Sequence, residues 1–334
     1  MDEVRAHTPA YLALHESGEL AERARRAQAM LRRCVTCPRN CRPDRTVGQL
    51  GVCRIGAVAQ VASHGPHFGE ERPLVGRGGS GTIFFAGCNL QCVYCQNHDI
   101  SQPSARTPAL RHEWLAPTQR LAEMMLDLQA RGCENINFVS PSHVAPQILA
   151  GIAAAAEGGL RLPLVYNSGG YDAVHTLRLL EGVMDIYMPD MKYSDPAIGE
   201  RLSSAADYVL RNRAAVKEMH RQVGDLAVDE RGVATRGLLV RHLVLPDVLA
   251  GTADVARFLA EEVSRDTYIN VMDQYRPAFK AAREDFERLC SGICRPLTAG
   301  EYRQAVEEVR AAGLWRLDGL VPDGSTPSPR EECP

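Results

Sequence analysis

The sequence lacks long hydrophobic runs and carries almost no net charge. No stretch approaches the roughly 18 consecutive apolar residues of a membrane-spanning helix. The opening residues, Met-Asp-Glu-Val-Arg, do not resemble the apolar segment of a secretory signal peptide. We therefore expect a cytoplasmic protein with no membrane partner. The formal net charge of −3 also argues against a nucleic-acid partner, because proteins that bind nucleic acid usually carry a basic surface.

Disulfide bonds are not expected either, although the chain has 11 cysteines. The cytoplasm keeps thiols reduced, so clustered cysteines there are more often metal ligands or catalytic groups than disulfides. Two clusters stand out, one between residues 34 and 53 and one between residues 88 and 95. Both are candidate metal sites.

Short apolar runs alternate with helical patterns through the chain. The runs predicted as strands are Thr82–Ala86, Asn135–Val139, Pro163–Tyr166, Met184–Met188, Leu238–Leu245 and Thr267–Met272. The helices predicted among them are Pro117–Ala130, Val144–Glu157, Asp172–Leu180, Ala206–Gln222 and Thr252–Val263. This alternation implies parallel strands joined by right-handed crossovers. We expect an α/β fold with a partial (β/α)6 barrel, and an open doubly wound sheet is the rival architecture.

The ends of the chain extend this unit. Residues 1–33 contain an N-terminal helix, predicted from residue 10, and residues 34–75 form a cysteine-rich extension with a short strand at Val58–Ala62. Residues 76–320 make up the barrel. Two helices are predicted to close it, at Phe279–Cys290 and Thr298–Ala312. Residues 321–334 form a tail that we expect to be disordered, because it is rich in proline and poor in apolar residues.

Three cysteines follow the first predicted strand of the barrel directly: Cys88, Cys92 and Cys95. Three thiolates in eight residues can wrap one small metal centre, and thiolate is the favoured ligand of iron–sulfur clusters. A four-iron cluster on three ligands would keep one iron open. Spacing alone leaves two alternatives, a structural zinc site completed by His98 and a group of free thiols.

The triplet, with Tyr94 before its last cysteine, resembles the cluster loop of the radical S-adenosylmethionine (SAM) superfamily. Residues 81–97, Gly-Thr-Ile-Phe-Phe-Ala-Gly-Cys-Asn-Leu-Gln-Cys-Val-Tyr-Cys-Gln-Asn, are similar to the branch related to pyruvate formate-lyase activating enzymes. The N-terminal cysteine pattern and the blocks 185–193, 240–246 and 274–277 resemble a mostly uncharacterised subgroup of that branch. The resemblance covers roughly residues 34 to 315.

This resemblance implies a [4Fe-4S] cluster on Cys88, Cys92 and Cys95, with SAM bound to the open iron. It implies reductive cleavage of SAM to a 5′-deoxyadenosyl radical that abstracts a hydrogen atom from the substrate, with an electron donor such as flavodoxin or ferredoxin. Activation of a glycyl radical protein and radical modification of a small molecule or peptide are both open. A zinc-stabilised binding protein without catalysis is the alternative from another class.

Residues that bind SAM should follow the carboxyl ends of the strands. Ser140 and His143 follow the second strand, where relatives often carry a glycine-rich, acid-ended segment that this chain lacks. Asn167 lies in a segment that resembles the Thr-Asn-Gly type of the activating enzymes. Asp190 and Lys192 match the Asp-x-Lys pattern of the same branch, and residues two apart point to the same side of a strand.

The fifth and sixth strands supply further candidates. Arg241 and His242 are adjacent in an apolar run, so they point to opposite faces and only one can face the barrel interior. We favour Arg241 as the functional residue of the pair. Asn270 and Gln274 are the candidates on the sixth strand.

The second cysteine cluster is Cys34, Cys37, Cys41 and Cys53. Four thiolates can close a tetrahedral zinc site or hold an auxiliary iron–sulfur cluster. A structural metal would stabilise a loop-rich segment that has little core of its own. The sequence leaves the identity of this metal open. The four remaining cysteines, Cys133, Cys290, Cys294 and Cys333, are interpreted as spectators.

Overall fold

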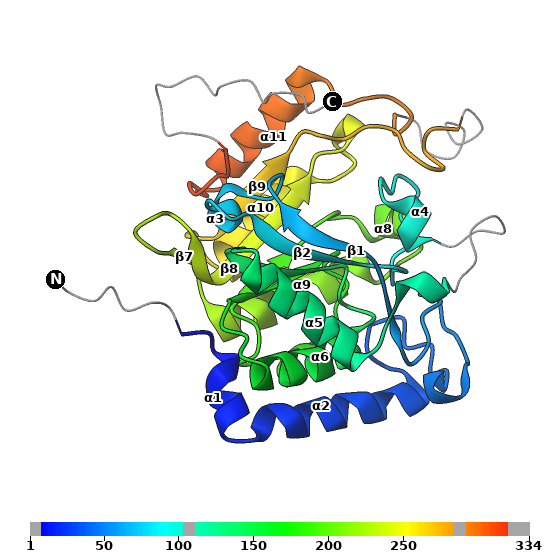
Figure 1. Ribbon diagram of the computed structural model, residues 1–334. Coiled ribbons are helices and arrows are strands. Elements are labelled where there is room, and N and C mark those ends of the chain that lie inside the picture. The colour runs from blue at the N-terminus through cyan, green and yellow to red at the C-terminus, as the bar shows by residue number, and fades with distance from the viewer. Residues whose placement is uncertain (1–7, 103–110, 284–291, 320–334) are drawn as a thin grey trace.

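Six parallel strands form the centre of the sheet, and they lie side by side in the order in which they occur along the chain. The computed structural model (Figure 1) describes residues 8–102, 111–283 and 292–319. The six strands are β2 (Ser80–Phe85), β4 (Asn135–Val139), β5 (Leu164–Ser168), β6 (Ile186–Pro189), β8 (Ala234–Leu243) and β9 (Tyr268–Met272). Each predicted run overlaps one of these strands, so the six strand predictions are confirmed.

Three further strands extend the sheet at its sides. β1 (Ala59–His67) runs antiparallel to β2, and the two-residue strand β3 (Leu115–Ala116) pairs with β1. β7 (Ala227–Val228) runs antiparallel to β8. Within the described residues the sheet does not close on itself. The fold is therefore α/β with an open, mainly parallel sheet, and the strand predicted at residues 58–62 is the first half of β1.

Most of the predicted helices are also present. The α-helices are α1 (Tyr11–Glu16), α2 (Glu19–Ala29), α3 (Arg72–Val75), α4 (His98–Ser101), α5 (Thr118–Ala130), α6 (Ala145–Glu157), α7 (Val174–Leu179), α8 (Pro196–Ser203), α9 (Tyr208–Val223), α10 (Thr252–Glu262) and α11 (Ala299–Ala311). Short 3-10 turns occupy Met30–Arg33, Arg45–Val47, His112–Trp114 and Pro246–Val248. The capping box of Thr298 and Glu301 at the start of α11 is formed as expected.

Two helix predictions need correction. The single helix expected from residue 10 to residue 33 is broken into α1 and α2, because Gly18 adopts a positive φ of 79° that an α-helix does not allow. The buried face expected for α2 is confirmed by Leu20, Ala24 and Ala27. Of the helix expected at Phe279–Cys290, residues 279–283 form turns and the rest lies outside the described residues. The tail at residues 321–334 also lies outside them.

The strand order decides where the helices lie. The parallel strands follow one another without any reversal of their order. Because the crossovers between such strands are right-handed, the connecting helices lie on one side of the sheet. Apolar side chains of that sheet face, such as Phe138, Tyr166 and Val240, share one hydrophobic core with those of α2, α5, α6, α9 and α10. A doubly wound sheet requires a reversal of strand order and helices on both faces, so that rival prediction is wrong.

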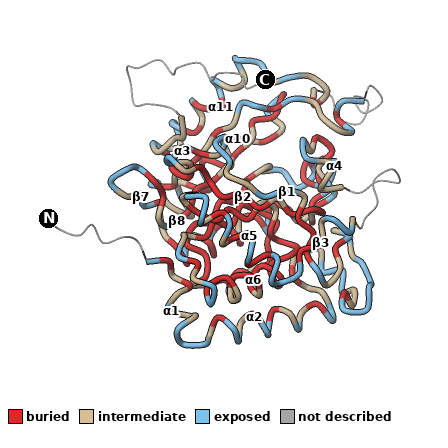
Figure 2. The backbone as a smooth tube through the Cα atoms, in the orientation of Figure 1, coloured by how far each residue is buried: buried red, intermediate tan, exposed pale blue. Residues whose placement is uncertain are grey.

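The opposite face of the sheet carries a smaller apolar cluster. Leu74 of α3 packs there with Val165, Met188 and Leu239. Asn167 and Arg241 follow Val165 and Leu239 on the same face, two positions nearer the carboxyl ends of β5 and β8. Buried residues therefore lie on both faces of the sheet, and Figure 2 shows the buried backbone concentrated in the middle of the molecule. Polar groups occupy the carboxyl end of the face that carries α3. No helix in the described parts of the chain is long and apolar enough to span a membrane.

Candidate functional site

The three-cysteine loop begins where β2 ends, at the carboxyl edge of the parallel strands. Gly87 starts the loop with a positive φ of 75°. A Cβ atom on Gly87 would lie 2.5 Å from the carbonyl oxygen of Cys53. Only glycine fits this turn without strain, because the backbone conformation is left-handed and the neighbouring chain is close. The four-cysteine segment thus contacts the three-cysteine loop at its first turn.

Each thiol of the loop has a hydrogen-bond partner that can donate to it, and Sγ of Cys88 also lies 3.9 Å from Oδ1 of Asn89. The backbone N–H of Leu90 donates to Sγ of Cys88 at 3.4 Å. Sγ of Cys92 lies 3.0 Å from Oγ of Ser203, at the end of α8. Sγ of Cys95 lies 3.2 Å from Oγ of Ser101 in α4. A thiolate can only accept hydrogen bonds, so all three positions suit thiolate ligands that are stabilised by donors.

The surroundings of the thiols are largely apolar. Burial raises the pKa of the Cys88 thiol to about 12, and the neighbouring Cys92 adds to this effect. Burial also raises the pKa of Cys92, but the ammonium of Lys192 lowers it in part. Metal ligation requires thiolates. A metal centre would therefore have to displace these protons, and the positive charge of Lys192 favours that step.

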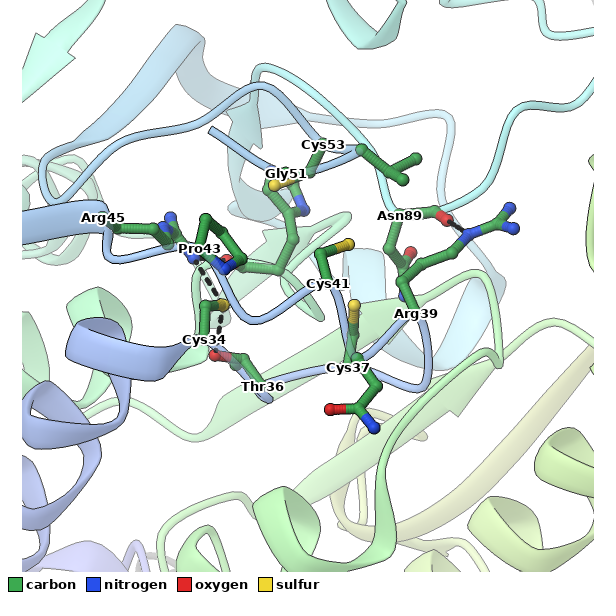
Figure 3. A pocket seen from close by; sticks show the side chains of 13 residues that line it. Cys34, Thr36, Cys37, Arg39, Cys41, Pro43, Arg45, Gly51, Cys53 and Asn89 are labelled. Atoms are coloured by element: carbon green, nitrogen blue, oxygen red, sulfur yellow. Dashed lines mark hydrogen bonds between the residues drawn. The ribbon is translucent and has the colours of Figure 1, made fainter. Parts of the chain in front are cut away.

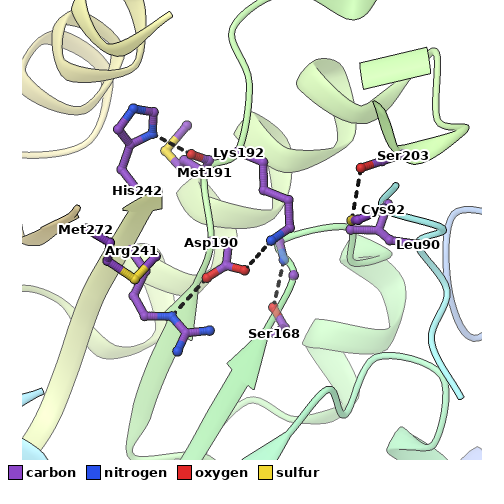
Figure 4. A network of polar contacts seen from close by, with 12 residues as sticks. Leu90, Cys92, Ser168, Asp190, Met191, Lys192, Ser203, Arg241, His242 and Met272 are labelled. Atoms are coloured by element: carbon purple, nitrogen blue, oxygen red, sulfur yellow. Dashed lines mark hydrogen bonds and ion pairs between the residues drawn. The ribbon is translucent and has the colours of Figure 1, made fainter. Parts of the chain in front are cut away.

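A charged network lies beside the loop (Figure 4). Nζ of Lys192 lies 2.6 Å from Oδ2 of Asp190, and Nε of Arg241 lies 2.9 Å from Oδ1 of the same carboxylate. Arg241 also donates to Oδ1 of Asn167 at 2.7 Å. The network therefore joins the carboxyl ends of three neighbouring strands, β5, β6 and β8, and contains two cations and one anion.

Each charge of the network is stabilised by the others. Burial alone would raise the pKa of Asp190, but Arg241 and Lys192 outweigh it and hold the pKa below its usual value. Burial alone would lower the pKa of Lys192, but Asp190 and Cys92 raise it to about 12. Two cations and one carboxylate therefore lie next to the cysteine loop, and Glu70 and Glu71 add acidic groups beside Arg241.

The structure brings four of the predicted SAM residues together: Asn167, Asp190, Lys192 and Arg241. The preference for Arg241 over His242 agrees with the geometry. His242 lies on the helix-covered side, fully buried, with Nδ1 at 2.6 Å from the carbonyl oxygen of Met191.

Three other predicted residues lie at or beyond the edge of the network. Ser140 adopts a positive φ of 61°, and its backbone N–H donates to the carbonyl oxygen of Asn167. Gln274 is exposed, with Nε2 at 3.2 Å from Sδ of Met272. His143 lies elsewhere, because it is buried against the four-cysteine segment, with Nε2 at 2.9 Å from the carbonyl oxygen of Ala86.

Several residues of the site were not found from the sequence. Glu71, which precedes α3, accepts a hydrogen bond from Nδ2 of Asn270 at 3.0 Å. Its neighbour Glu70 has a pKa raised to about 7, mainly by burial, while Arg241 acts in the opposite direction. The consecutive glutamates were a visible signal in the sequence. Ser203 gave no such signal, because it reaches Cys92 from an unpredicted helix.

The four-cysteine segment forms a pocket of its own (Figure 3). Cys34, Cys37, Cys41 and Cys53 all line it, in an empty volume of about 350 Å³ that is partly open to solvent. Burial raises the pKa of the Cys37 thiol to about 12. The four cysteines that the sequence groups as a possible second metal site therefore line one pocket.

Single-ion sites are not preformed in either cluster. Within residues 8–102, 111–283 and 292–319, no three His, Cys, Asp or Glu side chains converge as ligands of one metal ion. Nδ1 of His98 instead lies 3.2 Å from the carbonyl oxygen of Cys95, and its ring stacks on Phe279. The alternative zinc site with His98 as fourth ligand is thus not formed in this conformation.

Comparison with known proteins gives one clear relative. No protein-family model matches the chain. Over 285 residues the chain is 32% identical to the uncharacterized protein MJ0674 of Methanocaldococcus jannaschii, and the match covers 84% of this chain and 75% of that protein. It spans most of both sequences, so it is not confined to one motif. The chain therefore belongs to the same family as MJ0674.

Proposed function

We propose that this protein is a radical SAM enzyme, similar to pyruvate formate-lyase activating enzymes, with a [4Fe-4S] cluster on Cys88, Cys92 and Cys95. One observation carries the proposal. Lys192 and Asp190 form an ion pair at the carboxyl end of β6. This pair is close enough to Cys92 to influence the pKa of its thiol, which Lys192 lowers and Asp190 raises. A thiol triplet and a pair of opposite charges therefore meet at one edge of the sheet.

The thiol triplet fits an iron–sulfur cluster. Each sulfur has a hydrogen-bond partner that can donate to a thiolate, from Leu90, Ser203 or Ser101. Hydrogen bonds to the sulfurs are one of the factors that set the potential of such clusters. The sulfurs do not converge on one point, which suits a cluster, because each thiolate would bind a different iron.

The charged network fits the amino-acid part of SAM. That part is zwitterionic, so its site needs both signs of charge. Lys192 and Arg241 can meet a carboxylate, while Asp190 and the carbonyl of Asn167 can accept from an ammonium or a hydroxyl group. When bound, the reduced cluster and SAM would supply a 5′-deoxyadenosyl radical for hydrogen-atom abstraction. The chain's own residues would bind SAM, orient it toward the substrate and exclude water from the site.

The strand arrangement supports a partial (β/α)6 barrel as the scaffold. Six parallel strands follow one another without reversal, and the apolar residues of one face pack with the helices. Enzymes with barrels of this type place their active sites at the carboxyl ends of the strands. The cysteine loop after β2 and the network after β5, β6 and β8 occupy that end.

The proposal includes partners and a compartment. Reductive cleavage of SAM needs a one-electron donor, such as flavodoxin or ferredoxin. The reaction is the activation of a glycyl radical protein or the radical modification of a small molecule or peptide. A cytoplasmic location fits a protein with an exposed thiol at Cys41.

Iron analysis tests the cofactor assignment. We expect the protein to take up iron and sulfide in equal amounts on anaerobic reconstitution. A variant with Cys88→Ala, Cys92→Ala and Cys95→Ala should bind about four fewer irons per chain. Cys133→Ala is the matched control, because this buried cysteine belongs to the hydrophobic core. Equal iron content in the triple variant and the wild type would overturn the assignment, and a colourless protein that retains zinc would favour the zinc-stabilised binding protein.

A further inference from the structure

The four-cysteine pocket contains a buried positive charge. Arg45 is only 2% exposed, and it lines the pocket together with the four cysteines. Its Nε donates to the carbonyl oxygen of Gly56 at 2.9 Å, and its Nη1 donates to the carbonyl oxygen of His143 at 2.8 Å. Nη1 also lies 3.6 Å from Sγ of Cys34. A guanidinium is always charged, so this pocket holds a cation.

This cation has no carboxylate partner. Among the described residues no Asp or Glu lies within ion-pair distance of Arg45, and its Nη2 is buried without a hydrogen-bond partner. A buried charge is costly unless a counter-charge and hydrogen bonds compensate it. A negative charge in the pocket would therefore stabilise Arg45. The four thiols line the pocket and can supply this charge when they are deprotonated.

A second polar group of the pocket is also unpaired. Nε2 of His143 lies 2.9 Å from the carbonyl oxygen of Ala86, which leaves Nδ1 buried and without a partner. The two unpaired atoms, Nη2 of Arg45 and Nδ1 of His143, belong to residues that line the same pocket. Orphaned buried polar atoms require an explanation such as an absent ion or ligand.

We propose that Cys34, Cys37, Cys41 and Cys53 hold an iron–sulfur cluster through four thiolates, with Arg45 as its buried counter-charge. Metal-bound thiolates stay deprotonated, so a four-thiolate centre supplies the negative charge that the guanidinium lacks. This site is separate from the three-cysteine loop and shares no ligand with it, so the inference does not depend on the proposed function.

The spacing of the thiols favours a cluster over a zinc ion. Zinc bound to four sulfurs at about 2.3 Å holds those sulfurs within about 4 Å of one another. In the described part of the chain no three ligand side chains gather around one point in this way. In a cluster each thiolate can bind a separate iron, so the sulfurs stand farther apart.

The pocket is also joined directly to the three-cysteine loop. Nε of Arg39 donates to the carbonyl oxygen of Asn89 at 2.7 Å, and its Nη2 donates to the carbonyl oxygen of Ser203 at 3.0 Å. Arg39 lies between Cys37 and Cys41 in the sequence. A centre that fixes this short segment would therefore also fix the position of Arg39 against the loop.

The test uses the full chain in which Cys88, Cys92 and Cys95 are all replaced by alanine, so that any remaining metal belongs to the other site. We expect this variant to keep iron and sulfide in equal amounts after anaerobic reconstitution, with the absorption of a cluster. Adding Cys37→Ala and Cys41→Ala should remove this iron, whereas adding Cys133→Ala should leave it. Circular dichroism would verify that each variant remains folded.

A second variant keeps all four thiols. Arg45→Met removes the charge but retains most of the side-chain volume, so we expect the residual cluster to become harder to reduce. A potential equal to that of the parent variant would contradict the role of Arg45. If the triple variant binds zinc alone, or neither metal, the cluster at these cysteines is overturned. If the triple variant keeps this iron but the reconstituted wild-type protein does not cleave SAM, only the proposed function is contradicted.

Discussion

Oγ of Ser203 lies 3.0 Å from Sγ of Cys92, although 111 positions separate them in the sequence. Oγ of Ser203 is 2.8 Å from Oη of Tyr193, which in turn is 2.6 Å from Oη of Tyr94. If Cys92 is a metal-bound thiolate it can only accept, so Ser203 must donate to it. The direction of all three hydrogen bonds is then fixed: Tyr94 donates to Tyr193, Tyr193 donates to Ser203, and Ser203 donates to Cys92.

This relationship gives the first prediction. Ser203→Ala removes a donor to a negatively charged sulfur, and the reduced cluster, which has more negative charge, loses more stabilisation than the oxidised one. We expect the reduction potential of the cluster to fall by tens of millivolts in an anaerobic titration followed by electron paramagnetic resonance. Ser203→Thr keeps the hydroxyl group and should retain the wild-type potential. An unchanged potential in Ser203→Ala would show that the hydrogen bond does not reach a cluster ligand.

The second prediction concerns Lys192. Lys192→Met removes one of two cations that we assign to the SAM carboxylate, so the affinity for SAM should fall about tenfold or more, which corresponds to about 1.4 kcal/mol. Isothermal titration calorimetry on the reconstituted protein measures this change. Lys217→Met is the matched control, because Lys217 forms an exposed ion pair with Glu262 on the surface. Equal losses of affinity in both variants would contradict the assignment.

The third prediction separates backbone strain from steric contact. Gly87 and Gly132 both have a positive φ, at 75° and 81°, but a Cβ on Gly132 would meet nothing within 4 Å. Alanine at Gly132 should therefore cost about 1 kcal/mol of unfolding free energy. Alanine at Gly87 also collides with the carbonyl of Cys53, so we expect about 2–4 kcal/mol and a lower iron content. Denaturant unfolding that gives equal values for the two variants would argue against the close approach of Cys53.

The fourth prediction is a pH dependence of stability. Burial lowers the pKa of His242 to about 4, from an ordinary value of 6.5. Between these values the unfolded chain binds a proton that the folded protein excludes, so stability is complete above pH 6.5 and falls as the pH drops toward 4. The contribution is on the order of 3 kcal/mol.

A His242→Gln variant should therefore lose less stability between pH 7 and pH 4.5 than the wild type, as measured by urea unfolding at each pH. His112→Gln, at an exposed position, should follow the wild-type curve. Parallel curves for wild type and His242→Gln would mean that His242 is not the buried neutral group described here.

The sequence was most informative where a pattern repeats or a residue type is rare. All six central strands were predicted, because buried parallel strands are apolar runs separated by amphipathic helices. Arg241 was singled out because a charged residue in an apolar run stands out, whereas Asn167 and Asp190 were chosen because their segments resemble those of the activating enzymes. The same alternation predicts parallel strands but does not fix their order, so the sequence could not exclude the doubly wound rival.

Other features depend on contacts between distant segments and had no local signal. His143 follows β4, where a SAM ligand was expected, yet its ring is buried beside the four-cysteine pocket. Nothing in the local sequence indicated that the guanidinium of Arg45 is buried beside the four cysteines. The break between α1 and α2 had a local cue, Gly18, but a glycine within a helical pattern is often tolerated.

The most direct test of the central claim is the formation of 5′-deoxyadenosine. The protein is reconstituted with iron and sulfide under anaerobic conditions, reduced with dithionite and incubated with SAM, and the products are separated by liquid chromatography. We expect 5′-deoxyadenosine and methionine in equal amounts from the wild type, and none from the variant in which Cys88, Cys92 and Cys95 are alanine. An iron-loaded, reduced protein that leaves SAM intact, or a triple variant that cleaves SAM as fast as the wild type, would contradict the account.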